Sequence, residues 1–257
     1  MPGVYNESAV INIDLNLFRE GERGEVCFVS RHDTALLVEN CKVSLTDIGL
    51  CVEEGALMHH ALHVDEGGEI TLEGCEVFGG LYACFACSES KIHAKQSRFH
   101  SALSFGVTLL NSSANFYDCF IFRNKEDGFN ICGGTSKAYF SRSRLSDNKC
   151  HGMHVHNGAE VVLDLSEVLR NEQHGIAITG SDDQFQKRGE GDLKFSSVAL
   201  KDSKVRGNEF NGLFILDGSV RVRPLVYMHT RSKQLTTICI LRAICLLIYV
   251  LRLIECS

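Results

Sequence analysis

The chain has 257 residues, 44% of them apolar and 23% charged, with a formal net charge of −6. These proportions exclude a disordered chain, and the negative charge disfavours a nucleic-acid binder, which would carry a basic excess. Only two prolines occur, Pro2 and Pro224, so the interior of the chain contains nothing that interrupts hydrogen bonding between strands.

The N-terminal residues 1–33 contain one apolar segment with the spacing of a β-strand. It comprises Val10, Ile11, Ile13, Leu15 and Leu17. We expect these residues to form a partial first coil or a cap. No basic start with a continuous apolar stretch, as in a secretory signal, precedes the segment. The twelve cysteines are therefore expected to be reduced, in a cytoplasmic protein.

Residues 34–220 contain a repeat whose clearest mark is the motif Asn-x-x-x-Gly. The motif occurs at Asn124/Gly128, Asn148/Gly152, Asn171/Gly175 and Asn208/Gly212, with asparagines 24, 23 and 37 residues apart. The last interval contains residues 181–194, a polar stretch of 14 residues whose removal restores the period. A period of this length is typical of a stacked array in which each repeat contacts only its neighbours.

Small and apolar residues keep one register through the repeats. The small residue taken as position zero is Cys41, Cys75, Ser97, Cys119, Ser143, Ser166 or Ser203. Apolar residues recur in pairs two residues apart, which predicts short strands with one buried face. Three such strands in each repeat predict an all-β fold, a parallel β-helix (solenoid) of about seven to eight coils.

The first two repeats fit this register less regularly. Position zero at Cys41 would place Leu36, Val38 and Val43 in the same columns as the apolar residues of later repeats. The second repeat would place Phe85 and Cys87 towards the interior. Because the next position zero after Cys41 is 34 residues away, residues 53–65 are predicted to form an insertion.

Glycine and asparagine are expected to build the turns between strands. The recurrent glycines fit a turn that needs a permissive backbone, and they are Gly106, Gly128, Gly152, Gly175 and Gly212. The recurrent asparagines are expected to stack as a hydrogen-bonded ladder, formed by Asn124, Asn148, Asn171 and Asn208. A β-sandwich with coincidental spacing is the alternative, whereas a leucine-rich solenoid lacks its leucine framework here.

The Asn-x-x-x-Gly coils resemble the right-handed parallel β-helix repeats of the pectin-lyase-like superfamily, over roughly residues 34–220. That superfamily includes polysaccharide lyases and hydrolases as well as non-catalytic β-helices. This sequence resembles more closely the non-catalytic β-helices of the F-box-only proteins and of the SHC SH2-domain-binding protein, although it has no F-box-like helical segment. The resemblance implies a non-enzymatic module for protein interaction or scaffolding.

A carbohydrate-active enzyme or carbohydrate-binding protein of the pectin-lyase-like type is the alternative function. Sugar cleavage needs clustered carboxylates. The strand carboxylates Glu73 and Asp164 are four coils apart, as are Glu76 and Glu167, and no catalytic residue is predicted. The histidines of the later coils are interpreted as a surface patch, with no metal or cofactor, and they are His151, His154, His156 and His174.

A binding surface is predicted on the outer side of the strand that follows position zero. Exposed aromatic residues with arginine are typical of surfaces that bind partners, and here they are Phe78, Arg98, His100, Phe120, Phe122 and Arg144. The expected partner is a protein of unknown identity. Alternatively, the N-terminal segment or residues 181–194 cover this surface. Arg144 and Glu167, on adjacent coils, are expected to form an ion pair.

The C-terminal residues 221–257 are predicted to be a cap, with a possible capping helix, or an apolar tail. Residues 236–254 are strongly apolar and include Arg242 and Arg252. This segment could cover the last coil or act as a tail-type membrane anchor, for which two arginines are costly. It could also be a non-native or alternatively spliced end. Association with a membrane is expected only through this segment.

Overall fold

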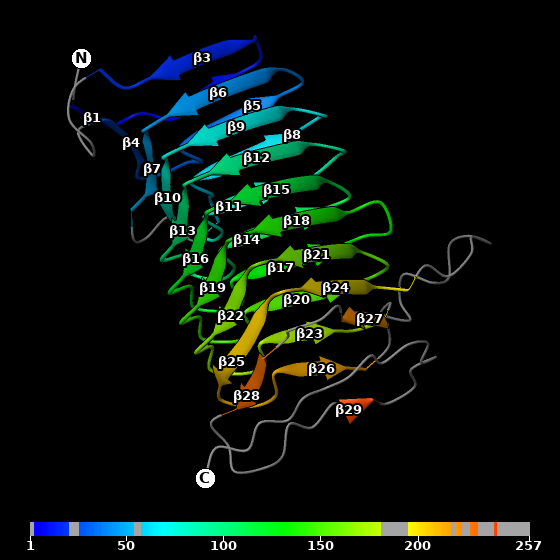
Figure 1. The fold of residues 1–257 in the computed structure, drawn as a ribbon. Helices are drawn as coiled ribbons and strands as arrows, with labels where there is room; N and C mark the ends of the chain where they lie inside the picture. The colour runs from blue at the N-terminus through cyan, green and yellow to red at the C-terminus, as the bar shows by residue number, and fades with distance from the viewer. Residues whose placement is uncertain are drawn as a thin grey trace.

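A computed structural model describes residues 3–20, 26–53, 58–180, 195–216, 219–222, 227–230 and 239–240. In these residues the regular structure consists of β-strands, without a helix. The strands wind into a stack of coils, with β1–β3 at one end and β28 near the other (Figure 1). Each coil contributes one strand to each of three parallel sheets, which we call sheets A, B and C.

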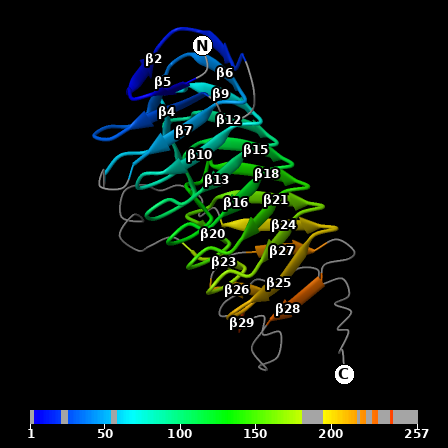
Figure 2. The same ribbon diagram turned by 90° about the vertical axis from the view of Figure 1, so that its left-hand side faces the viewer.

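The three sheets form the walls of the stack, and Figure 2 turns towards the viewer the side where sheet A lies. Sheet A contains β1 (Gly3–Tyr5), β4 (Val26–Ser30), β7 (Gly49–Val52), β10 (Glu76–Gly79), β13 (Arg98–His100), β16 (Phe120–Phe122), β19 (Arg144–Ser146), β22 (Glu167–Leu169), β25 (Lys204–Asn208) and β28 (Tyr227–Thr230). Sheet B contains β2 (Ala9–Ile11), β5 (Leu36–Glu39), β8 (Leu62–Asp65), β11 (Cys84–Ala86), β14 (Val107–Leu110), β17 (Phe129–Cys132), β20 (Met153–His156), β23 (Ile176–Ile178), β26 (Leu213–Ile215) and β29 (Cys239–Ile240). Sheet C contains β3 (Leu15–Phe18), β6 (Lys42–Thr46), β9 (Glu69–Glu73), β12 (Lys91–Lys95), β15 (Ser113–Tyr117), β18 (Lys137–Ser141), β21 (Glu160–Asp164), β24 (Ser197–Lys201) and β27 (Ser219–Val222).

The predicted parallel β-helix with three short strands per coil is confirmed. Strands of successive coils pair in register, as Phe129 with Met153 in sheet B and Phe120 with Arg144 in sheet A. The register also holds across residues 181–194, which lie outside the described residues. There β21 pairs with β24 and aligns Glu160 with Ser197, as removal of the polar stretch predicts.

The interior of the coils is filled by apolar side chains from all three sheets. Its centre is a cluster of fully buried rings, Phe99, Phe116, Phe129 and Phe140. The rings of Phe116 and Phe140 stack with centroids 4.7 Å apart, and Phe129 meets Phe140 edge-on at 4.9 Å. Burial of each such ring contributes about 1.5–3 kcal/mol, so these columns dominate the stability of the fold.

Serine is favoured at position zero because its hydroxyl links one coil to the coil before it. The Ser143 Oγ accepts a hydrogen bond from the Cys119 N–H at 3.1 Å, and the Ser166 Oγ accepts one from the Ser143 N–H at 3.1 Å. Both serines are buried at the corner between sheets C and A. A small side chain with an acceptor therefore satisfies a backbone donor that the corner would otherwise leave unpaired.

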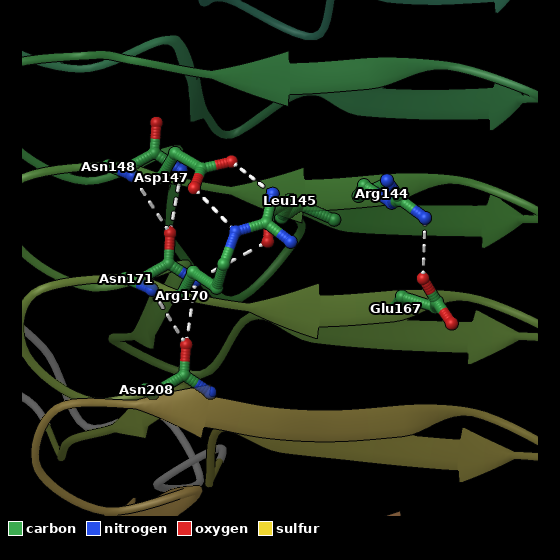
Figure 3. Close-up of polar contacts among 8 residues, drawn as sticks. All are labelled: Arg144, Leu145, Asp147, Asn148, Glu167, Arg170, Asn171 and Asn208. Carbon is green, nitrogen blue, oxygen red and sulfur yellow. Dashed lines mark hydrogen bonds and ion pairs between the residues drawn. The ribbon is translucent and has the colours of Figure 1, made fainter. Parts of the chain in front are cut away.

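Asparagines stack in a ladder at the corner between sheets A and B (Figure 3). The Asn148 Oδ1 accepts hydrogen bonds from the backbone N–H and the Nδ2 of Asn124, at 3.1 and 2.9 Å. The Asn171 Oδ1 accepts the same pair of bonds from Asn148, and the Asn208 Oδ1 accepts them from Asn171. All four asparagines are fully buried.

The ladder also explains why glycine accompanies asparagine. A Cβ at Gly128 would lie 2.5 Å from the Asn148 Nδ2 and 2.8 Å from the Gly152 carbonyl oxygen. Glycine is therefore needed at this position because there is no room for a side chain. The expected reason, a backbone conformation that only glycine adopts easily, does not apply here. Positive φ angles among the described glycines occur elsewhere, as at Gly133. In an earlier coil the glycine position is occupied by Ala83. The next coil there has Ala102 in place of a ladder asparagine, so no asparagine side chain lies against Ala83.

The expected register of the first repeat is wrong. Leu36 and Val38 lie in β5 of sheet B, and Val43 lies in β6 of sheet C. The reason is that small residues occupy two corners of each coil. Cys41 precedes β6, which pairs with β9, and Ile48 instead fills the column of Cys75. The predicted insertion at 53–65 is also too long, because its last four residues form β8, while residues 54–57 lie outside the described residues.

The inward placement of Phe85 and Cys87 is wrong as well. Cys84 and Ala86 align with Val107 and Leu109 and are fully buried, so Phe85 and Cys87 face outwards. The turn that leads into β11 is one residue shorter than the corresponding turns of later coils. The alternation of the strand is shifted by one position as a result.

The two ends of the chain are described to different extents. Strands β1, β2 and β3 add one strand each to sheets A, B and C. Of the predicted cap or tail at 221–257, the described backbone comprises the end of β27, β28 and β29, and the rest lies outside the described residues. Almost all of the apolar segment 236–254 is thus not described. Across the described residues, none forms a helix long and apolar enough to span a membrane.

A histidine-rich face on sheet B

The outer face of sheet B and the turns that lead into it carry two groups of rings, which are separated by the coil of β17. Because equivalent positions of successive coils lie about 4.8 Å apart, these side chains stack along the axis of the fold. The first group comprises His60, His63, Tyr82, Phe85 and Phe105, and the second comprises His151, His154, His156, His174, Phe210 and Phe214. We call this surface the histidine face.

The N-terminal half of the histidine face is mainly aromatic. Tyr82 lies between His60 and Phe105, stacked on the former at 4.9 Å and on the latter at 5.5 Å between centroids. Phe85 leans against both His60 and Tyr82. Burial lowers the pKa of His60 to about 4, so this ring is neutral near pH 7. This half therefore offers flat, uncharged ring surfaces.

The C-terminal half is organised around the carboxylate of Asp127. Its side chain is only 6% exposed, and its Oδ2 lies 3.6 Å from the Nδ1 of His154. The backbone N–H of His151 donates a hydrogen bond of 2.8 Å to the Asp127 Oδ1, which fixes the carboxylate. On the other side of the imidazole, the His154 Nε2 is 3.0 Å from the Thr179 Oγ1. The His154 ring therefore has a hydrogen-bond partner at Nε2 and faces a carboxylate at Nδ1.

Two further histidines of this half are fixed as neutral hydrogen-bond donors. The Nδ1 of His151 accepts the backbone N–H of His174 at 3.2 Å, and the Nδ1 of His174 accepts that of Asn211 at 3.1 Å. Burial lowers the pKa of His151. Burial, and repulsion from a protonated His151, lower the pKa of His174 to about 4. With Nδ1 engaged as an acceptor, each neutral ring carries its proton on Nε2.

In acid–base chemistry these side chains could have different roles, one as a base and the others as hydrogen-bond donors. With its proton on Nδ1, towards the Asp127 carboxylate 3.6 Å away, His154 would offer Nε2 as a base, in the way a buried aspartate orients a catalytic imidazole. Neutral imidazoles that donate from Nε2 can stabilise negative charge developing on a bound molecule. His156 extends the array, since its ring stacks on that of His154 at 4.6 Å.

The predicted binding residues lie together on a different wall, the outer face of sheet A. Phe78, His100 and Phe122 form a stack with centroids 5.2 and 4.8 Å apart. In the neighbouring column, Arg98 aligns with Phe120, and Phe120 aligns with Arg144. Phe120 and Arg144 line a hollow of about 470 Å³. The structure thus brings the six residues together, and their role as a binding surface stays a prediction.

The predicted ion pair between Arg144 and Glu167 is confirmed, with 2.9 Å between the Arg144 Nη2 and the Glu167 Oε2 (Figure 3). Glu167 also lies 3.5 Å from Lys204 and from Arg206. This carboxylate therefore belongs to a network of surface charges. The other strand carboxylates that were considered as catalytic candidates also have basic partners. Glu73, for example, forms an ion pair with Lys95.

Sequence reasoning missed Asp127. The carboxylates considered as catalytic candidates were those of the strands and of the stretch 181–194, whereas Asp127 lies in the turn before β17, directly before Gly128. Its partner His154 is on the next coil, 27 residues later in the chain. The signal that could have identified Asp127 is the repeat itself, because the repeat places the turn residue of one coil beside the outward-facing residues of the next coil.

Comparison with known proteins supports the fold. The family model for right-handed β-helix regions matches residues 26–190. No curated protein is similar enough to count as a relative. Among solved structures, the periplasmic alginate epimerase AlgG T265N mutant matches with a TM-score of 0.60 and 16% identity, over 80% of this chain and 51% of that one. The chain therefore spans about half the length of that epimerase.

Two further solved structures match more weakly. Pectate lyase Pel9A gives a TM-score of 0.47 with 12% identity, over 82% of this chain and 62% of that one. The A-module of the Azotobacter vinelandii mannuronan C-5 epimerase AlgE4 gives 0.41 with 11% identity, over 88% and 87%.

The expectation of a non-enzymatic module for protein interaction or scaffolding is contradicted. The match at a TM-score of 0.60 is to an alginate epimerase, which is an enzyme by its name. A closer similarity to the β-helices of the F-box-only proteins and the SHC SH2-domain-binding protein is not shown, whereas the pectin-lyase-like fold is. At these identities the likeness establishes the fold alone, and the chemistry has to be inferred from the side chains.

Proposed function

Since this chain belongs to the family of right-handed β-helix regions, we propose that it binds a polysaccharide along the histidine face and carries out proton transfer on it with His154. The observation that carries this proposal is the pair formed by His154 and the buried Asp127, 3.6 Å apart, beside two neutral histidines. The predicted alternative of a carbohydrate-active protein thereby becomes the main hypothesis. The cytoplasmic location remains a prediction.

The shape of the histidine face suits a long, narrow ligand. Its rings form two groups, each extending over three successive coils, and Asp127 lies on the coil between them, so a chain of sugar units lying along the face would contact several coils. The aromatic half can pack against the apolar faces of sugar rings. The polar half offers imidazole nitrogens and the Thr179 hydroxyl to sugar hydroxyls.

The arrangement favours abstraction of a proton from a carbon next to a carboxylate, as in a sugar acid. His154 would accept that proton at Nε2, while Asp127 stabilises the resulting imidazolium. The negative charge that develops on the substrate carboxylate would be stabilised by Nε2–H of His151 and His174, which need no change of protonation. The alginate epimerase and the pectate lyase are, by their names, proteins that act on such acidic polymers, so these are the first substrates to test.

The test is to incubate the purified chain in D₂O with alginate, polygalacturonate or a neutral β-glucan. Proton NMR would follow the exchange of sugar C–H for deuterium, and ultraviolet absorbance would follow unsaturated products. We expect exchange with an acidic polymer, reduced about 100-fold or more by His154→Ala, as for loss of a general base. His93→Ala is the matched control, because His93 lies on the outer face of sheet C.

The outcomes separate the two parts of the proposal. Exchange that persists in His154→Ala would exclude this residue as the base. Binding of a polysaccharide without exchange would retain the histidine face as a carbohydrate-binding surface and reject the proton transfer. Absence of both binding and exchange with all three polymers would reject the proposed function.

A further inference from the structure

We propose that His63, Asp65 and Cys87 form a zinc-binding site on the outer face of sheet B. The site lies on β8 and at the end of β11, three to four strand spacings from β20, which carries His154. This corresponds to about 14–19 Å along the stack. It is therefore separate from the proposed proton-transfer residues, and it does not depend on the proposed function.

The distances between the three donor atoms suit one tetrahedral zinc ion. The Cys87 Sγ lies 3.5 Å from the His63 Nε2 and 3.1 Å from the Asp65 Oδ1. The His63 Nε2 is 4.0 Å from the second carboxylate oxygen, Asp65 Oδ2, and one donor atom from each of the three residues lies within 4.8 Å of the other two. Zinc bonds of about 2.0 Å to nitrogen or oxygen and about 2.3 Å to sulfur, at tetrahedral angles, separate ligand atoms by about 3.3–3.6 Å. The ion thus fits with small side-chain adjustments.

The parallel register places these ligands together. His63 and Asp65 are two residues apart on β8, so both point outwards from the same strand, and Cys87 follows β11 on the next coil directly beside Asp65. The shift in register before β11 is what turns Cys87 outwards. Without it, Cys87 would align with the inward Val64 and its thiol would lie in the core.

The neighbours of the ligands hold them in place. The Asp65 Oδ1 accepts the backbone N–H of Glu66 at 2.7 Å. The ring of His63 packs against Phe85 at 5.0 Å and meets His60 edge-on at 5.5 Å. The side chains of His63 and Asp65 are 22% and 28% exposed, so an ion could enter while the ligands stay largely fixed. Such outer contacts are what metal ligands need for a defined geometry.

The donor set selects the metal. One nitrogen, one oxygen and one sulfur favour zinc over calcium or magnesium, which take oxygen ligands. Three protein ligands leave a fourth position for water. Without metal, the Cys87 thiol donates its hydrogen bond to Asp65. When zinc binds, the S–H bond breaks, a zinc–thiolate bond forms and the proton passes to the buffer, so binding weakens at acid pH.

Other described cysteines lack this environment. Among the described residues, no second group of three such side chains brings its donor atoms within 4.8 Å of one another. Cys132 provides a matched control. It lies in the same outward column as Cys87, two coils further along, and is also half-buried.

The test uses the full chain in metal-free reducing buffer, titrated with zinc against a chromophoric chelator. We expect one zinc ion per chain to be held by the wild type and by Cys132→Ser. In Cys87→Ser the affinity should fall at least about 100-fold, and likewise in His63→Ala. Titration with Co²⁺ should give a thiolate-to-cobalt charge-transfer band in the wild type and in Cys132→Ser that is absent in Cys87→Ser.

Thermal unfolding without metal shows that each variant is folded before its affinity is compared. Zinc held equally by wild type and Cys87→Ser, no zinc held by the wild type, or a cobalt complex without the thiolate band would each overturn the proposal. Because no polysaccharide enters this experiment, failure of the zinc site and failure of the proposed function are distinguished.

Discussion

Replacement of Asn148 by alanine tests how much the asparagine ladder stabilises the fold. The Oδ1 of Asn148 is the acceptor for the backbone N–H and the Nδ2 of Asn124, and its own Nδ2 donates to Asn171 at 2.9 Å. Alanine would remove all three bonds. Two donors of Asn124 would then remain fully buried without an acceptor, while the Asn171 Oδ1 would keep the bond from the backbone of residue 148.

The magnitude follows from those two orphaned donors. Each buried polar group without a partner costs about 1–3 kcal/mol, and the cost is highest where the group keeps its desolvation penalty. The expected loss in the free energy of unfolding is therefore about 3–5 kcal/mol. Asn115→Ala is the control. Asn115 is half-buried on the outer face of sheet C, where its Nδ2 lies 3.2 Å from the His93 Nδ1, and its loss should cost less than about 1 kcal/mol.

Urea unfolding followed by circular dichroism measures both variants. Asn148→Ala should lower the midpoint with little change in the m-value, since the surface exposed on unfolding stays nearly the same. A loss for Asn148→Ala no larger than that for Asn115→Ala would refute the reasoning that the ladder satisfies buried donors.

Three further predictions concern packing, pH and backbone strain. Gly128→Ala should lose about 1–3 kcal/mol in urea unfolding, because its Cβ would lie 2.5 Å from the Asn148 Nδ2, whereas an unchanged midpoint would show that space is not the constraint. Because His151 and His174 have pKa values lowered in the fold, the unfolded chain binds protons first, so stability present above about pH 6.5 should be lost towards pH 4. That loss should be smaller in His151→Asn/His174→Asn, and an equal slope of urea midpoint against pH would contradict it. Leu165 is exposed with φ at 51°, so Leu165→Asn should raise the free energy of unfolding by about 0.5–1 kcal/mol, and a decrease would argue against backbone strain there.

Much of the fold could be predicted because the repeat can be recognised from the spacing of residues in the sequence. The period fixes the columns, and alternation within each strand fixes which residues face inwards, as for Phe129 and Ile131. The predictions failed where a turn changed length by one residue. At β11 a short turn reversed the alternation, and it moved Phe85 and Cys87 to the outer surface.

The candidate site was harder to predict than the fold. Its groups come from the turn before β17 and from β20, on separate coils, and no local motif joins them. The histidines were visible in the sequence, but their neutral state depends on burial and on backbone donors such as the Asn211 N–H. Asp127 lies in a turn, and only the stacking of coils places it beside His154.

The most direct test of the proposed function is a crystal structure of the chain with an oligosaccharide of an acidic polymer bound. The proposal predicts sugar units lying along the outer face of sheet B, with one sugar carbon within reach of the His154 Nε2 and its carboxylate at His151 and His174. An oligosaccharide bound only on sheet A, over Phe120 and Arg144, would contradict it.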